Sequence, residues 1–292
     1  MPSKMWRVVD LLDWTVGYFQ QHGIPNPRLD AEILLGHLLE KSRLQLYLHF
    51  EMPVFQEHLT PFRELIKKRI ARTPVSYLTN RKEFMSLDFY VDERVLIPRP
   101  ETEQLVETIL TTKTGDFQRL LELGTGSGVI ATSLAVQQPE WEIVATDISE
   151  PALAVARKNA ETHACTTQIR FLPGDLFEPI EAINTNGGTR FDWIVCNPPY
   201  IKSTERATLS PDVRDYEPEI ALFAGDDGLT VIRRLIAEAP KYLASNGKLI
   251  LEIGATQADA VRTLLDAESA YASYELLKDY AEKERVVLAR VL

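Results

Sequence analysis

The sequence predicts an α/β fold in which a doubly wound, mainly parallel sheet follows a small helical domain. Three observations predict it. Apolar residues recur at helical spacing through residues 1–83. Beyond residue 99, short apolar strand patterns alternate with helical ones, the order found in parallel sheets with crossover helices. A glycine-rich turn joins the first of these strands to its helix, at the edge of the sheet where such folds bind ligands.

The chain divides into three predicted parts. Residues 1–83 form a small helical bundle, with helices expected at 6–22, 27–40, 43–50 and 61–72. Residues 84–98 alternate apolar and polar side chains around Asp92-Glu93-Arg94, which predicts a hairpin linking the domains. Residues 99–292 form the sheet domain, with strands expected near 119–123, 142–147, 168–172, 191–196 and 247–253, and a closing antiparallel pair near 273–279 and 285–291.

The glycine-rich turn reads Gly-Thr-Gly-Ser-Gly at residues 124–128. Glycines let the backbone approach a ligand closely, and the following helix presents free N–H groups. Val129 stands where the dinucleotide fingerprint needs its third glycine, and no lysine follows, so neither a dinucleotide site nor a P-loop fits. The candidate ligand-binding residues of this region are Glu122, Gly124, Thr125, Gly126 and Gly128.

Acids follow the next two predicted strands. Asp147 ends the second strand, 19 residues after Gly128, where a carboxylate can accept hydrogen bonds from both ribose hydroxyls of a nucleoside. Asp175 follows the third strand and could accept from an adenine amino group, with Leu176 and Ile148 against the ring. Together these residues predict an adenosine pocket. Because nothing supplies a pyrophosphate clamp, S-adenosylmethionine, with S-adenosylhomocysteine as its product, fits better than NAD.

The fourth predicted strand ends in Asn197-Pro198-Pro199-Tyr200. The nitrogen of a planar NH2 group shares its lone pair with a π system, so an enzyme must hold both N–H bonds on acceptors to aim that lone pair. The Asn197 side-chain oxygen and the Pro198 carbonyl could be these acceptors, and the two prolines stiffen the turn. Tyr200 offers a ring face for stacking. The tetrapeptide therefore predicts a site for an amide or base NH2, with Asn197 also bordering the cofactor.

Charge is unevenly distributed along the chain. Residues 1–83 carry 12 Lys and Arg against 9 Asp and Glu, which leaves 20 against 33, a net charge of −13, for residues 84–292. A protein that acts on bare nucleic acid usually surrounds its cleft with basic residues, so this balance disfavours that class. The basic residues of the 61–72 helix form either a solvated face or a docking surface for an acidic or RNA-bearing partner: Lys67, Lys68, Arg69 and Arg72.

The remaining composition excludes other classes. The two cysteines and five histidines have no spacing that suggests a metal site, so no metal is expected. No apolar stretch approaches the ~18 residues of a membrane span. The N-terminus lacks an apolar signal core, which predicts a cytoplasmic protein.

With an adenosine pocket followed by an amino-nitrogen site, the chain resembles the class I S-adenosylmethionine-dependent methyltransferases with their Rossmann-like fold. Further segments make it similar to the PrmC/HemK family, the protein-(glutamine-N5) methyltransferases of bacterial peptide chain release factors. The resemblance extends from about Asp10 to Val291, and Asn80 stands where glycine is expected. The segments are Arg28-Leu29-Asp30-Ala31-Glu32-Ile33-Leu34-Leu35, Leu96-Ile97-Pro98-Arg99-Pro100-Glu101-Thr102-Glu103, Val213-Arg214-Asp215-Tyr216-Glu217-Pro218 and Gly225-Asp226-Asp227-Gly228-Leu229.

The resemblance implies methylation of the glutamine in the Gly-Gly-Gln loop of class I release factors, with substrate recognition by the helical domain. It implies catalytic roles for Asn197, Pro198 and Tyr200. Pro199, Arg99 and Pro100 would complete the substrate site, although Arg99 and Pro100 could equally support the turn before the first helix of the sheet domain. We also expect Arg214 and Glu217 to pair and shape the loop over the substrate.

Three alternatives remain open at this point. The sibling family that methylates a glutamine of a ribosomal protein shares the core motifs. A nucleic-acid methyltransferase could use the same tetrapeptide on adenine N6 or guanine N2, but it needs room for a flipped base and a basic approach path. A non-catalytic protein that keeps the fold is the third, and the intact motifs give it no support.

Overall fold

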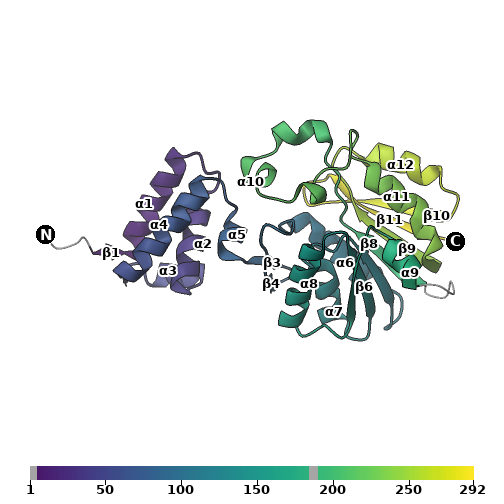
Figure 1. Ribbon diagram of the computed structural model, residues 1–292, viewed down its shortest axis with the longest axis horizontal. Helices are drawn as coiled ribbons and strands as arrows, with labels where there is room; N and C mark the ends of the chain where they lie inside the picture. Colours follow the sequence, from purple (N-terminus) through teal and green to yellow (C-terminus); the bar gives the residue numbers. More distant parts are fainter. Residues whose placement is uncertain (1–4, 184–189) are drawn as a thin grey trace. The chain divides into compact units, whose positions relative to one another are not determined.

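A computed structural model of the chain describes residues 5–183 and 190–292 (Figure 1). The chain forms two compact units. The helical unit comprises Met1–Arg81 and a second segment, Ser210–Tyr216. The sheet unit comprises Lys82–Leu209 and Glu217–Leu292. The chain therefore crosses between the units three times, because the segment Ser210–Tyr216 leaves the sheet unit and returns to it.

The helical unit is a small bundle around one apolar core, which includes Leu12, Phe19, Leu35 and Phe62. Local signals explain where several of its helices begin: Pro27 occupies the first turn of α2, and a reciprocal capping box between Ser42 and Gln45 opens α3. The elements of this unit are β1 (Trp6–Arg7), α1 (Val8–Gln21), α2 (Pro27–Leu39), α3 (Arg43–Leu48), β2 (Pro53–Val54), α4 (Gln56–Ile70), α5 (Val75–Thr79) and α10 (Pro211–Arg214).

Helix α4 begins earlier than the sequence predicts. We expected Pro61 to open the helix, but α4 begins at Gln56 and Pro61 lies inside it. The N–H of His58 donates to the carbonyl of Phe55, which starts the first turn before the proline is reached. The predicted start at Pro61 is therefore wrong, since a proline tolerated within a helix was taken as its first residue.

The basic residues of α4 do not form a continuous cationic surface. Arg69 is only 4% exposed, its Nε donates to Asp30 Oδ2 over 2.7 Å, and its terminal nitrogen lies 2.8 Å from a carboxylate oxygen of Asp212. Arg72 donates to the backbone carbonyls of Gly23 and His22. Lys67 and Lys68 are exposed, and both interpretations, a solvated face or a docking surface, now rest on these two lysines.

The same contacts attach the segment Ser210–Tyr216 to the helical unit. Asp212 lies in the first turn of α10 and pairs with the buried Arg69, while the hydroxyl of Tyr216 donates to the carbonyl of Ala71 over 2.6 Å. The segment therefore has two side-chain attachments to the C-terminal end of α4.

A hairpin opens the sheet unit, but its turn is not where we predicted it. Strands β3 (Lys82–Phe84) and β4 (Leu87–Phe89) pair antiparallel around Met85 and Ser86, both with positive φ. The predicted turn at residues 92–94 is wrong, because Asp92 instead accepts hydrogen bonds from the backbone and guanidinium of Arg94 and forms a local turn beyond the hairpin.

Seven strands form the main sheet, in the order β10-β11-β9-β8-β5-β6-β7. Strands β5 to β9 are parallel, and β10 and β11 form the predicted antiparallel closing pair at one edge. The strand order reverses at β5, which pairs with both β6 and β8. The strands are β5 (Arg119–Leu123), β6 (Glu142–Asp147), β7 (Ile169–Pro173), β8 (Phe191–Cys196), β9 (Leu243–Glu252), β10 (Tyr271–Lys278) and β11 (Glu284–Val291).

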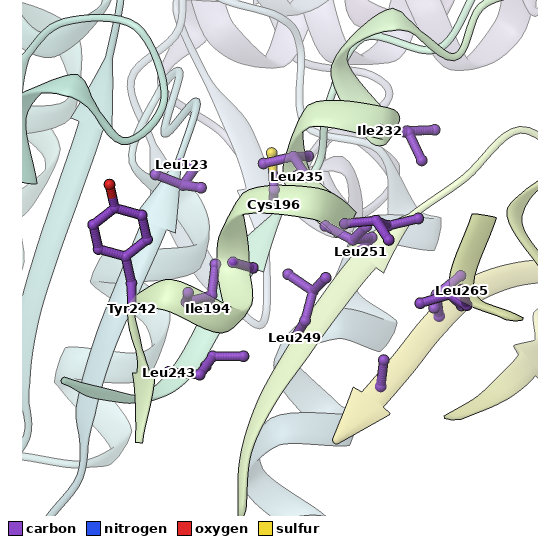
Figure 2. Packing of buried hydrophobic residues seen from close by; sticks show 14 of the residues in the cluster. Leu123, Ile194, Cys196, Ile232, Leu235, Tyr242, Leu243, Leu249, Leu251 and Leu265 are labelled. Atoms are coloured by element: carbon purple, nitrogen blue, oxygen red, sulfur yellow. The ribbon is translucent and has the colours of Figure 1, made fainter. Parts of the chain in front are cut away.

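Alternate residues of each central strand face opposite layers. Leu121, Ile194 and Leu251 belong to one buried cluster, which includes residues of the two helices α11 (Thr230–Glu238) and α12 (Ala258–Asp266). Figure 2 shows part of this cluster. The intervening residues pack on the other face against α6 (Glu103–Thr112), α7 (Val129–Gln137) and α8 (Glu150–Thr162). Sheet and helices thus form the three layers of a doubly wound fold.

Shorter elements complete the sheet unit. They are η1 (Pro100–Thr102), α9 (Glu178–Ile183), η2 (Ser203–Thr208), η3 (Glu219–Ala221) and η4 (Ala239–Lys241). Among the described residues, none of the helices combines the length and the apolar character needed to cross a membrane.

Candidate active site

One cavity of the sheet unit lies at the carboxyl ends of β5, β6 and β8, where the strand order reverses. A reversal of this kind opens a crevice because the helices on its two sides cover opposite faces of the sheet. Most of the predicted site residues line this cavity together: Glu122, Gly124, Thr125, Gly126, Asp147, Ile148, Asp175, Leu176, Asn197, Pro198 and Pro199.

The glycines of the turn between β5 and α7 have two different tasks. Gly124, Gly126 and Gly128 all have positive φ, at 67°, 56° and 76°. A Cβ on Gly126 would meet no neighbouring atom within 4 Å, and one on Gly124 would meet only Cys196 Sγ at 4.0 Å. A Cβ on Gly128 would lie 2.9 Å from the Cβ of Ala156 in α8. Gly128 does not line the cavity, so its predicted ligand contact is replaced by a helix-packing role.

Asp147 is held in a fixed orientation at the end of β6. The N–H of Gly126 donates to its Oδ2 and the N–H of Ser149 to its Oδ1, both over 2.8 Å. Burial raises the pKa of Asp147, and the two backbone amides act in the opposite direction. Each carboxylate oxygen keeps a further lone pair, so both can still accept hydrogen bonds from a ligand in the cavity.

Glu122 is buried at the end of β5, and its Oε2 accepts from the hydroxyl of Thr125 and from the N–H of Ala131. Burial raises its pKa to about 8, because removal from water disfavours the charged form. The carboxyl therefore orders the glycine turn, and near neutral pH much of it carries its proton.

The third acid, Asp175, forms an ion pair with Arg234. Arg234 of α11 donates to its Oδ2 over 2.7 Å, which leaves the other oxygen for a ligand. Leu176 lines the cavity beside it, as does Ile148, a large apolar side chain that is 55% exposed.

The tetrapeptide after β8 is tied to two residues that sequence reasoning missed. The Nδ2 of Asn197 donates to Thr102 Oγ1 over 2.9 Å, and the Thr102 hydroxyl donates to Glu252 Oε2 over 2.7 Å. The hydroxyl of Tyr200 donates to the other oxygen of Glu252 over 3.1 Å. Burial raises the pKa of Glu252, while the hydroxyls of Thr102 and Tyr200 counteract this shift.

The position of Tyr200 differs from that of the preceding three residues. Its side chain packs against the core cluster of the sheet, and it is not among the residues that line the cavity. Burial raises the pKa of its hydroxyl well above the usual value. The sequence did contain a signal for its partner Glu252. This residue is a single acid at the end of the apolar strand β9, just as Asp147 ends β6 and Glu122 lies one residue before the end of β5.

The segment before α6 contributes Pro98 and Thr102 to the cavity, and not Arg99 and Pro100 as we predicted. Arg99 turns instead to Glu217, whose carboxylate it contacts over 2.7 Å.

The expected pair between Arg214 and Glu217 stays a prediction, and the contacts described for each of them are with other residues. Glu217 is only 5% exposed, and its second carboxylate oxygen accepts from the N–H of Ile97. Arg214 pairs with its exposed neighbour Asp215. Glu217 therefore supports the 97–99 segment at the edge of the cavity.

Comparison with known proteins agrees with this geometry. Residues 10–79 match the PrmC N-terminal domain, and residues 100–210 match the methyltransferase small domain. The chain is 41% identical to the release factor glutamine methyltransferase of Chlorobaculum tepidum, over 98% of both chains, and 41% identical to that of Geobacter sulfurreducens, over 88% of both. The chain belongs to the release factor glutamine methyltransferase family.

Solved structures support the fold of this methyltransferase. A methyltransferase from Pyrococcus furiosus superposes with a TM-score of 0.51 at 18% identity, over 81% of this chain and 98% of that one. The catalytic domain of hMettl16, solved with an RNA hairpin, gives a TM-score of 0.56 at 18% identity, over 76% and 81% of the two chains. At this identity the likeness concerns the class I methyltransferase fold alone.

Proposed function

We propose that this methyltransferase transfers the methyl group of S-adenosylmethionine to the side-chain amide nitrogen of the glutamine in the Gly-Gly-Gln loop of class I release factors. The observation that carries the proposal is that an oriented Asn197, the glycine turn and Asp147 line the same cavity. Relatives named release factor glutamine methyltransferase, similar over nearly the whole chain, support the choice of substrate.

The cavity residues fit S-adenosylmethionine. Gly124 and Gly126 leave room for a ligand close to the backbone, where any side chain would intrude. Asp147 presents two oriented oxygens to the ribose hydroxyls, and the free oxygen of Asp175 accepts from the adenine amino group. The ring would lie against Ile148 and Leu176, with Glu122 and Thr125 ordering the turn.

When bound, S-adenosylmethionine supplies a methyl group that its sulfonium already activates. The task of the protein is then to position the glutamine amide. Asn197 Oδ1 and the Pro198 carbonyl accept one N–H each, so the nitrogen lone pair faces the methyl group. Pro199 stiffens the turn. Orientation of this kind can lower a barrier by roughly 7–11 kcal/mol, so no strong base is required and the proton can leave afterwards.

We assign Tyr200 to anchoring the tetrapeptide, since its hydroxyl binds Glu252 and its ring lies outside the cavity lining. Arg99 and Pro100 support the segment that contributes Pro98 and Thr102. The helical unit would recognise the release factor, and a cytoplasmic location suits such a substrate.

The proposal is tested by transfer of labelled methyl from S-adenosylmethionine to a purified release factor. A variant of the factor with alanine in place of the Gly-Gly-Gln glutamine is the matched control, and a ribosomal protein and duplex DNA are run in parallel. We expect label only on the intact release factor. Label on the ribosomal protein or DNA instead would keep the methyltransferase but replace its substrate, and label on none would overturn the proposal.

A further inference from the structure

We propose that Thr102 and Glu252 are positioning residues that determine which way the Asn197 side-chain amide faces. This inference rests on the proposed function, because it concerns how Asn197 meets the substrate amide. Thr102 ends the turn η1 before α6, and Glu252 ends strand β9. Their hydrogen bond joins residues 150 positions apart in the sequence. Both side chains are buried, Thr102 at 3% and Glu252 at 1% exposure.

The polarity of the hydrogen bonds is set at Glu252. Its two carboxylate oxygens each receive a hydroxyl, one from Thr102 and one from Tyr200. A hydroxyl carries a single proton, so Thr102 has none left to donate once it has bound Glu252. Toward Asn197, the oxygen of Thr102 can only accept.

This polarity selects one of the two orientations of the Asn197 amide. Only Nδ2 can donate to Thr102, as observed over 2.9 Å, and this leaves Oδ1 as the atom that can accept from the substrate. In the opposite orientation, Nδ2 would face the N–H bonds of the substrate amide, and Oδ1 would face a hydroxyl with no proton to give. Without Thr102, both orientations become accessible, and only one is productive.

Glu252 extends this control to the whole tetrapeptide. The same carboxyl group is linked to Asn197 through Thr102 and directly to Tyr200, so the first and last residues of the tetrapeptide share one buried acceptor. The charge of Arg285 favours the ionised form of Glu252, in which both oxygens accept, and the charge of Glu101 opposes it. The acceptor sits on β9, which pairs directly with β8, the strand that carries the tetrapeptide.

The test compares Thr102→Val, which has the same shape without the hydroxyl, with Thr102→Ser, which keeps the hydroxyl. With release factor as substrate, we expect Thr102→Val to lower kcat at least 10-fold, which corresponds to about 1.4 kcal/mol and to the loss of one hydrogen bond that orients Asn197. The dissociation constant for S-adenosylhomocysteine should change by less than about threefold, since cofactor contacts are untouched. Thr102→Ser should retain kcat within about threefold for the same reason.

Two further variants make the comparison independent of folding. Thr15→Val makes the same change at a buried threonine whose hydroxyl has no hydrogen-bond partner among the described residues, and it should leave kcat unchanged. Glu252→Gln keeps the side-chain volume, but its one amide oxygen can replace only one of the two carboxylate oxygens that accept from Thr102 and Tyr200. We therefore expect the Asn197 amide to populate both orientations and kcat to fall. Unchanged kcat in Thr102→Val and Glu252→Gln, with wild-type melting temperatures, would overturn the inference.

A second readout needs no substrate and therefore separates this inference from the proposed function. In protein labelled with ¹⁵N-asparagine, the Nδ2 signal of Asn197 is assigned by its loss in Asn197→Ala. We expect slow proton exchange at this group in the wild type and in Thr102→Ser, and fast exchange in Thr102→Val. Equal exchange in all three would contradict the hydrogen-bond chain. A wild type that shows the protection but methylates no release factor would overturn the proposed function alone.

Discussion

Three buried carboxyl groups at the ends of parallel strands have different partners and therefore different tasks. Asp147 is held by two backbone amides and stays available to a ligand. Glu122 binds a hydroxyl and an amide of its own turn, which makes it a support of the glycine region. Glu252 accepts two hydroxyls and orders the tetrapeptide. The partner atoms of each acid, more than its position at a strand end, distinguish ligand binding from support.

At this scale, Asn197 and Asp147 should separate catalysis from cofactor binding. Asn197→Ala removes the amide acceptor and should reduce kcat by at least 1000-fold, while the dissociation constant for S-adenosylhomocysteine stays within about threefold. Asp147→Ala removes the oriented carboxylate and should raise that constant at least 30-fold, the equivalent of two hydrogen bonds at roughly 1 kcal/mol each. Calorimetry and single-turnover methylation measure the two effects. A large loss of cofactor affinity in Asn197→Ala would contradict the assignment of catalysis to Asn197 and cofactor binding to Asp147.

Glu122 should make the stability of the protein depend on pH. Its folded-state pKa of about 8 lies above the unfolded value of 4.5, so its contribution is fully present below pH 4.5 and is lost as pH rises through 8. At about 1.36 kcal/mol for each pH unit between the two pKa values, the loss amounts to about 5 kcal/mol. Glu122→Gln keeps an acceptor oxygen and cannot ionise, so it should flatten the fall in unfolding free energy between pH 5 and 8. Urea titrations across this range would show the difference, and parallel curves for the two proteins would contradict it.

At the scale of elements, the turn between β5 and α7 combines a ligand-facing and a helix-facing glycine. Gly126 opens toward the cavity, whereas Gly128 lets the start of α7 approach Ala156 of α8. The glycines of one regular G-x-G-x-G pattern therefore meet two different structural requirements, space for a ligand and close packing of two helices.

Alanine at these two positions should have different consequences for ligand binding and for stability. Gly126→Ala places a methyl group in the cavity and should weaken S-adenosylhomocysteine binding at least tenfold, at a stability cost of about 1–2 kcal/mol for the left-handed backbone. Gly128→Ala adds a clash with Ala156 to the same strain and should cost about 3 kcal/mol or more. Thermal unfolding and calorimetry on both variants test this, and a Gly126→Ala protein with wild-type affinity would refute the proposed position of the ligand.

At the scale of the whole molecule, the buried Arg69 joins three separate parts of the chain. It lies in α4 and contacts Asp30 in α2 and Asp212 in α10. Burial raises the pKa of Asp30, and the guanidinium of Arg69 acts against that rise. The arginine therefore favours the charged form of Asp30 inside the helical unit.

Removing this cation should destabilise the helical unit selectively. Arg69→Met leaves a buried, unpaired Asp30 and should cost about 3–5 kcal/mol. Hydrogen exchange should accelerate in α2 and α4 but not in the strands of the sheet. Lys68→Met makes the same type of change at the exposed neighbouring position and should have little effect. Uniform acceleration throughout both units, or none at all, would contradict the assignment.

The sequence was sufficient for the parallel strands because their apolar runs are short, continuous and separated by helical patterns. The turn of the first hairpin was not predictable in the same way. Met85 and Ser86 adopt positive φ without being glycine or asparagine, so no local preference marked them. The adjacent Phe84 and Phe89 are both buried, and this packing outweighs turn propensity.

Some parts of the candidate site could likewise be predicted from the sequence, and others could not. Asp147, Asn197 and the glycine turn were identified because each ends a strand, and strand ends converge in a parallel sheet. The link from Thr102 to Glu252 has no local signature, since it depends on the side-by-side placement of β8 and β9 and on the start of α6.

The segment Ser210–Tyr216 also bears on how this protein can be divided or recombined. Because it packs with the helical unit while its covalent neighbours belong to the sheet unit, residues 1–81 are not a complete module. A chimera that takes only residues 1–81 from a relative would place a foreign α4 against the native Asp212 and Tyr216. Changes in the helical unit are therefore coupled, through a few residues far along the chain, to the segment that follows the tetrapeptide.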